Sequence, residues 1–116
     1  MNVKKGRILS GMRPSGRLHV GHYIGGLRNW ARLQDEYDCY FMAADWHALM
    51  GEYEKPSVLS KYSIDNVIDW LAFGIDPAKS TVFVQSRVPE HLELHMVFSC
   101  LTPLGWLERC PTYKEQ

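Results

Sequence analysis

The sequence predicts a parallel α/β fold, and three observations support this prediction. Short apolar runs lie at residues 7–12, 39–44 and 81–84, and the last two lack the polar alternation of a half-exposed strand. Amphipathic helical patterns at residues 20–36 and 57–73 separate these runs. The resulting order of strand, helix, strand, helix and strand is typical of a doubly wound parallel sheet. We expect residues 39–44 to form a central strand covered on both faces.

The predicted helices are bounded by recognisable residues. The pattern at residues 20–36 contains Gly25 and Gly26, each of which costs about 1 kcal/mol in helix propensity. We therefore expect a close helix-to-sheet contact at that turn. The second helix spans residues 57–73, and Pro89 is suited to start a third.

Length and composition exclude several classes of protein. A chain of 116 residues is the length of one compact domain, and its 46% hydrophobic content excludes intrinsic disorder. No apolar run approaches the roughly 18 residues that span a bilayer, and no signal-type stretch follows the first residues. We therefore expect a cytoplasmic protein without a membrane segment. The three widely spaced cysteines fit neither a disulfide framework nor a zinc site, so we expect Cys39 in the core and no metal ligands.

Positive charge is concentrated at the start of the chain, although the net charge is zero. Residues 1–34 contain seven Lys and Arg residues and no Asp or Glu. Such a segment indicates an anionic ligand, with phosphate the usual candidate, or else a solvated basic face. The seven residues are Lys4, Lys5, Arg7, Arg13, Arg17, Arg28 and Arg32.

Polar residues follow each predicted strand at its carboxyl end, at residues 10–14, 45–47 and 85–87. Ligands of doubly wound sheets bind beyond the carboxyl ends of the strands, so we expect these three clusters to form one site. Asp45 and His47 are expected there to support the site or orient a substrate rather than to act as an acid–base pair.

A short motif, His19-Val20-Gly21-His22, lies where the basic loop becomes the first helix. The unpaired N–H groups of a first helical turn and the positive end of the helix dipole attract phosphate. The two histidines share one helix face, and Gly21 lets a nucleotide lie against the backbone. The alternative is that both histidines are only cap and surface residues.

Four longer segments extend this motif. They are GMRPSGRLHVGHYIGGLRNW at residues 11–30, ADWHAL within residues 43–49, VFVQS at residues 82–86 and LERCPTYKE at residues 107–115. In this order they resemble class I aminoacyl-tRNA synthetases, the first segment resembling the HIGH-motif region and the set resembling the bacterial tryptophanyl-tRNA synthetases. Tyrosyl enzymes of archaeal and eukaryotic type share the first two patterns, whereas LERCPTYKE favours tryptophan.

The resemblance implies that residues 1–116 are the N-terminal half of a Rossmann-like catalytic domain. The implied reaction is ATP-dependent activation of L-tryptophan to tryptophanyl-adenylate, with Mg²⁺, and transfer of the acyl group to tRNA(Trp). Arg13 departs from the Gln of many bacterial members. By resemblance, the catalytic residues are His19 and His22; ATP is bound by Arg13, Pro14, Ser15, Gly21 and His22; and the amino acid is bound by Ser10, Gly11, Ala44, His47 and Gln85.

The resemblance also implies a homodimer that uses the apolar region from Leu94 to Trp106. The family's KMSKS signature, its acidic segment and its anticodon-binding helices are absent from the chain. We therefore expect this chain alone to be a very poor synthetase. Two alternatives stay open: a tyrosine–tRNA ligase fragment, and a non-catalytic paralogue that binds nucleotide or dimerises.

Overall fold

Three strands form one parallel sheet with the second strand in the middle, in a computed structural model that describes residues 4–115. Each strand lies within one residue of its predicted bounds, and the predicted parallel α/β fold is confirmed. The strands are β1 (Arg7–Met12), β2 (Asp38–Ala43) and β3 (Ser80–Val84).

The helix after β1 consists of three contiguous segments, α1 (Val20–His22), the π-helical η1 (Tyr23–Leu27) and α2 (Arg28–Leu33). The N–H of Arg28 donates to the carbonyl of Tyr23, five residues back, which is the hydrogen bond of a π-turn. The expected close contact at the glycine pair is wrong. A Cβ on Gly25 would meet nothing within 4 Å, and one on Gly26 would meet only the Met12 methyl group at 3.9 Å. The glycines belong to a widened helical turn instead of a tight packing contact.

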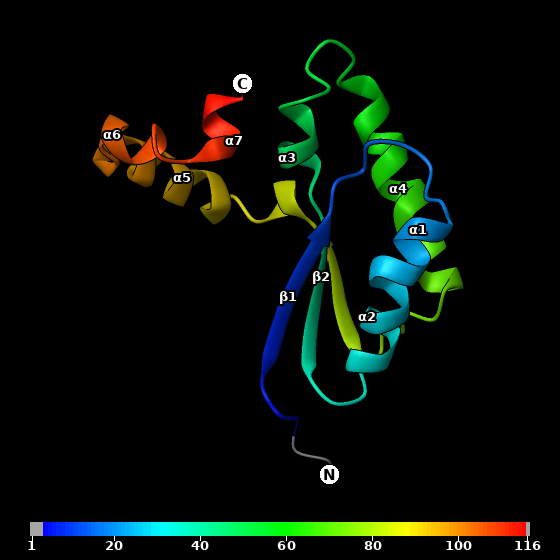
Figure 1. Cartoon of the computed structure of the whole chain (residues 1–116). Helices are drawn as coiled ribbons and strands as arrows, with labels where there is room; N and C mark the ends of the chain where they lie inside the picture. The colour runs from blue at the N-terminus through cyan, green and yellow to red at the C-terminus, as the bar shows by residue number, and fades with distance from the viewer. Residues whose placement is uncertain (1–3, 116) are drawn as a thin grey trace.

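The hydrophobic core lies between the sheet and the helices α2 and α4 (Ser57–Ala72), which cover the same face of the sheet (Figure 1). Its centre is aromatic. The Trp30 ring stacks on Phe41, with 4.6 Å between centroids, and meets the edge of Trp70 at 5.2 Å. Trp70 and Phe41 are fully buried, so the sheet and α4 share one apolar cluster.

Burial along β2 alternates, which corrects the expectation of a strand covered on both faces. Cys39, Phe41 and Ala43 are fully buried beneath the helices, and the Cys39 thiol lies in the core as predicted. Tyr40 and Met42 point to the opposite face and are half-buried. All of residues 39–44 are apolar, so both faces of this strand are suited to burial. The helices of residues 4–115 cover only one of the two faces.

A buried glutamine connects the helical layer to the start of β3. The Gln34 side chain donates from Nε2 to the carbonyl of Gly74 at 2.7 Å. Its Oε1 accepts from the N–H of Asp76 at 2.8 Å and from the hydroxyl of Ser80 at 3.1 Å. Because all its polar groups are paired, Gln34 is stable in the interior and holds the connection into β3 in place.

The remaining helices follow the carboxyl ends of β2 and β3. The helix predicted to start at Pro89 is confirmed as α5. Residues 45–49, directly after β2, form a short helix. Within residues 4–115, no helix is both long and apolar enough to cross a bilayer. These elements are α3 (Asp45–Leu49), η2 (Gln85–Arg87), α5 (Glu90–Leu101), α6 (Leu104–Leu107) and α7 (Pro111–Lys114), the last three extending away from the sheet (Figure 1).

Candidate active site

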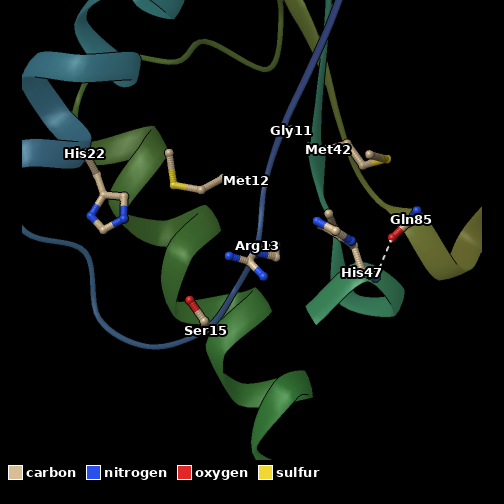
Figure 2. Close-up of a pocket in the computed structure, with 9 residues that line it drawn as sticks. Gly11, Met12, Arg13, Ser15, His22, Met42, His47 and Gln85 are labelled. Atoms are coloured by element: carbon tan, nitrogen blue, oxygen red, sulfur yellow. Dashed lines mark hydrogen bonds between the residues drawn. The ribbon is translucent and has the colours of Figure 1, made fainter. Parts of the chain in front are cut away.

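The carboxyl ends of the three strands open into one cavity of about 610 Å³. That volume lies within the range of small-molecule sites, roughly 300–1,000 Å³. All three predicted polar clusters contribute to it, as sheet topology requires. The residues that line it are Gly11, Met12, Arg13, Ser15, His22, Met42, Ala44, His47 and Gln85 (Figure 2).

Gly11 and Met42 are paired in register on neighbouring strands at the cavity wall. A Cβ on Gly11 would lie 3.0 Å from the Met42 carbonyl oxygen and 3.1 Å from its side-chain methyl group. Backbone atoms cannot move aside as a flexible side chain can. The wall therefore favours glycine at position 11, because a larger residue there would have to displace the Met42 backbone by a few tenths of an ångström.

Asp45, His47 and Gln85 connect the ends of β2 and β3. The Asp45 carboxylate accepts the N–H of Ser86 at 3.0 Å and that of Trp46 at 3.0 Å. The N–H of His47 donates to the Gln85 side-chain oxygen at 3.1 Å (Figure 2). Asp45 thus supports the loop geometry, as expected, while the His47 imidazole and the Gln85 amide group line the cavity.

The His19–His22 motif forms a reciprocal cap at the start of α1. The His19 Nδ1 atom accepts the N–H of Gly21 at 3.1 Å, and the His22 Nδ1 atom accepts the N–H of His19 at 3.2 Å. The two ring centroids lie 4.0 Å apart. The alternative that both histidines act as cap residues is therefore confirmed, since both rings accept backbone N–H groups. His22 has a second role, because it also lines the cavity.

Four of the predicted site residues do not line the cavity. Pro14 is fully buried, and Ser10 lies on the half-buried side of β1 with Ile8 and Met12. Gly21 lies in the first helical turn. His19 lines a separate hollow of about 360 Å³. The other residues of this hollow are Tyr23, Asp69, Phe73 and the two residues adjacent to His19 in the sequence.

Two methionines that sequence analysis missed, Met12 and Met42, line the cavity. Both lie in predicted strands; Met12 falls within the polar cluster at residues 10–14 without being assigned a role, and Met42 lies outside all three clusters. Their contribution depends on the register between β1 and β2, which places Met42 opposite Gly11. Once that pairing is known, strand alternation is the signal that would have found Met42.

Most of the positive charge at the start of the chain lies away from the cavity. Lys5 pairs with Glu36 at 2.6 Å and Arg7 with Asp38 at 3.4 Å, at the amino ends of the strands. The hydrogen bond between Lys5 and Glu36 raises the pKa of the lysine and lowers the pKa of the carboxyl group. Among the described residues that line the cavity, Arg13 is the only Lys or Arg.

A parallel sheet with a strand-end cavity, bounded by the HIGH-like helix start, defines the class of Rossmann-like class I synthetase folds. The family model described as tRNA synthetases class I (W and Y) matches residues 1–116. The chain belongs to this family.

Comparisons with individual proteins point to the tryptophan branch. The chain is 61% identical over 110 residues to a tryptophan–tRNA ligase of Ralstonia nicotianae, covering 95% of this chain and 28% of that protein. A solved tryptophanyl-tRNA synthetase of Campylobacter jejuni, complexed with ADP and tryptophan, is 37% identical with a TM-score of 0.84. That likeness covers 94% of this chain and 34% of the other. A tyrosyl-tRNA synthetase of Archaeoglobus fulgidus, with a TM-score of 0.77 and 22% identity over 91% of this chain and 34% of the other, shares the fold.

The chain spans about a third of the length of these relatives. What the comparisons show directly is the family and the fold of this segment. Catalysis, substrates and assembly belong to the whole relatives, and for this chain they are inferred below.

Proposed function

We propose that this chain supplies the ATP-binding and part of the tryptophan-binding surface of a tryptophan–tRNA ligase. The observation that carries the proposal is the 61% identity to such a ligase across a segment whose strand ends form the candidate cavity. The rival tyrosine assignment rests on patterns shared by both enzymes and on a likeness of 22% identity. A non-catalytic paralogue is less well supported, because seven of the residues assigned to the substrates line one cavity.

In the proposed reaction, the carboxylate of L-tryptophan attacks the α-phosphorus of ATP and pyrophosphate leaves. The adenylate then transfers its acyl group to tRNA(Trp). Reactions of this kind are catalysed mainly by positioning and by neutralising charge on phosphate oxygens. The side chains suited to that purpose are the Arg13 guanidinium and the His22 imidazole, which line the same cavity.

We assign the two substrates to opposite sides of the end of β1. Arg13, Ser15 and His22 lie toward the helical segment and suit ATP, with Pro14 and Gly21 shaping the backbone there. Across the strand end lie His47 and Gln85 (Figure 2), and the amino acid is assigned to these two residues with Gly11 on β1 and Ala44, while Ser10 supports the strand.

Mg²⁺ is assigned to the nucleotide as part of its MgATP substrate form. Hard oxygen ligands such as phosphates and carboxylates suit this ion. The phosphate oxygens of ATP are therefore assigned as its ligands. A cytoplasmic location fits a reaction that uses ATP and tRNA.

Substitution of Arg13 tests the substrate assignment. We expect Arg13→Ala to weaken ATP binding roughly ten- to hundredfold, the worth of one charged hydrogen bond, while tryptophan binding changes less than threefold. Calorimetric titration of each ligand measures both. Arg28→Ala is the matched control, because Arg28 is exposed on another hollow of the helix. Equal losses for both ligands would refute the assignment.

The whole reaction is tested by tryptophan-dependent exchange between ATP and pyrophosphate. Because the chain spans a third of its relatives, we expect the 116 residues alone to bind ATP but to exchange far more slowly than a full-length ligase. If tyrosine instead of tryptophan drives the exchange in a full-length parent, the tryptophan assignment is wrong and the tyrosine–tRNA ligase assignment replaces it.

We also propose that α5, α6 and α7 form a homodimer contact. Leu101 and Trp106 are 70% and 67% exposed, and large exposed apolar areas mark interaction surfaces. We expect Trp106→Glu to weaken self-association at least tenfold in sedimentation equilibrium. Tyr53→Glu is the control, because Tyr53 is an equally exposed aromatic residue (70%) on a loop of the α/β region. A wild-type chain that stays monomeric at roughly 100 μM would contradict the proposal.

A further inference from the structure

A second cavity lies beside the candidate active site. Its volume is about 490 Å³, which is also within the range of small-molecule sites. The residues that line it come from α3, the start of α4, the end of β3 and η2. None of them lines the candidate active site, so the two cavities are separate.

Much of the lining of this second cavity is apolar. Leu59 and Ser63, one helical turn apart on α4, are both buried. Trp46 and Leu49 on α3 and Val84 at the end of β3 add further apolar surface. The hydroxyl of Ser63 donates to the carbonyl of Leu59 at 2.8 Å, so this buried polar group is already paired. Such a lining suits an apolar side chain.

Two charged side chains of opposite sign also line the second cavity, Asp45 and Arg87. They belong to one junction, because the Asp45 carboxylate accepts the N–H of Ser86, the residue before Arg87, at 3.0 Å. The five ion pairs among the described residues include neither Asp45 nor Arg87. A simple anion would meet the carboxylate and a simple cation would meet the guanidinium, whereas a zwitterion pairs with both.

The second cavity shares a wall with the candidate active site. Ala44 and His47 line the active site, whereas the two residues between them line the second cavity. Gln85 and Ser86, at the end of β3, are divided in the same way. A ligand in the second cavity would therefore lie against the residues that form the amino-acid side of the candidate active site.

We propose that the second cavity binds a free α-amino acid with an apolar side chain. The planar Arg87 guanidinium suits the carboxylate of the ligand. Asp45 Oδ1 already accepts the N–H groups of Trp46 and Ser86, which leaves Oδ2 for the ammonium group. The two charged groups of an α-amino acid share one carbon atom, as Asp45 and Arg87 share one junction, and the apolar side chain packs against Leu59. This site does not depend on the proposed function.

L-Phenylalanine is the probe, because tryptophan would also bind the proposed substrate site. The four tryptophans of the chain report its position in ¹H–¹⁵N spectra of the ¹⁵N-labelled protein. We expect the indole N–H signal of Trp46 to shift, with a Kd of about 1 mM or tighter. Those of Trp30 and Trp70, in the core, and of Trp106, on α6, should stay in place. An unchanged Trp46 signal at about 20 mM phenylalanine overturns the proposal.

Two analogues test the pairing of both charges. N-acetyl-L-phenylalanine lacks the positive charge, and L-phenylalaninamide lacks the negative charge. We expect each to bind at least tenfold more weakly than L-phenylalanine, because each leaves one charged side chain of the site without a partner. In Arg87→Gln, phenylalanine and its amide should bind equally, since the partner of the carboxylate is gone. Equal affinity of all three compounds for the wild type would contradict recognition of a zwitterion.

Two isoleucines on α4 provide a matched pair of variants. Ile64 and Ile68 are 59% and 58% exposed, and only Ile64 lines the second cavity. Ile64→Asp places a carboxylate beside the carboxylate of the ligand, so we expect at least tenfold weaker binding of phenylalanine. Ile68→Asp should bind it within about twofold of the wild type. Equal losses in both variants would contradict the assigned position.

The same spectra separate this site from the proposed substrate site. Shifts of the His47 and Gln85 signals with an unchanged Trp46 signal would place phenylalanine in the candidate active site and overturn the second site. A chain that binds neither ATP nor tryptophan but shifts Trp46 with phenylalanine would remove the proposed function and leave the second site standing.

Discussion

The α/β body (residues 4–88) and the C-terminal arm (residues 90–115) use similar apolar residues in opposite ways. In the body, Trp70 and Phe41 are fully buried between sheet and helices. In the arm, α5, α6 and α7 contain no buried residue among those described, and Trp106 is 67% exposed. Figure 1 shows the arm extending from the body at the side opposite α2 and α4. An apolar helical pattern thus predicts a helix that packs against another surface. It does not predict whether that surface belongs to residues 4–115 themselves.

Two tryptophans give the largest expected difference between these regions. We expect Trp70→Ala to lower the free energy of unfolding by about 3–5 kcal/mol, because it removes a buried indole from the core. Trp106→Ala should change it by less than about 0.5 kcal/mol in dilute solution, where no second copy covers the arm. Urea denaturation followed by circular dichroism compares them. A large loss from Trp106→Ala at low concentration would show that the arm packs on its own body.

The three free cysteines provide an intermediate effect. Cys39 is fully buried, and burial raises the pKa of its thiol, so the reactive thiolate is disfavoured in the folded state. Cys100 and Cys110 are exposed on the arm. In dilute solution, where no second copy covers the arm, we expect iodoacetamide to modify the two arm cysteines at least a hundredfold faster than Cys39, as measured by peptide mass spectrometry. Comparable rates at all three would mean that the body opens readily.

The smallest effect is expected at the amino end of the sheet, where Lys5 and Glu36 form an exposed ion pair. Lys5→Ala should leave the denaturation midpoint nearly unchanged at neutral pH, since exposed pairs contribute little. The lowered pKa of the Glu36 carboxyl group stabilises the folded state above the ordinary carboxyl pKa, and this contribution is lost as the pH falls through the lowered value. Acid titrations of wild type and Lys5→Ala at low and high salt should therefore differ only at low salt. A difference that persists in high salt would mean that Lys5 has a packing role.

Sequence reasoning succeeded where the signal is local. The three strands were placed within one residue, and α4 ends one residue before its predicted end. The prediction that residues 10–14, 45–47 and 85–87 meet also holds, because parallel topology brings all carboxyl ends to one edge. Chain order is sufficient for such statements, since each depends on a run of neighbouring residues and a general rule.

Sequence reasoning failed where an answer depends on distant residues. Gly25 and Gly26 suggested a close contact, yet their turn is π-helical and open. The basic residues before position 35 left an anionic site and a solvated basic face as alternatives, and only the structure shows that Lys5 and Arg7 are paired with Glu36 and Asp38 at the surface, whereas Arg13 lines the cavity. Composition records how many charges a segment has, whereas their partners are set by which strand ends lie side by side.

The sequence by itself determined the order of the elements, the parallel sheet and the family, because these follow from periodicity and from motifs read along the chain. Only the tertiary structure decided that Met42 faces Gly11, that His22 and not His19 lines the cavity, and that one face of β2 is left half-exposed. The physical reason is that hydrogen bonds between neighbouring residues are encoded locally. Strand register, ring orientation and burial arise from contacts between segments that the chain brings together only when it folds.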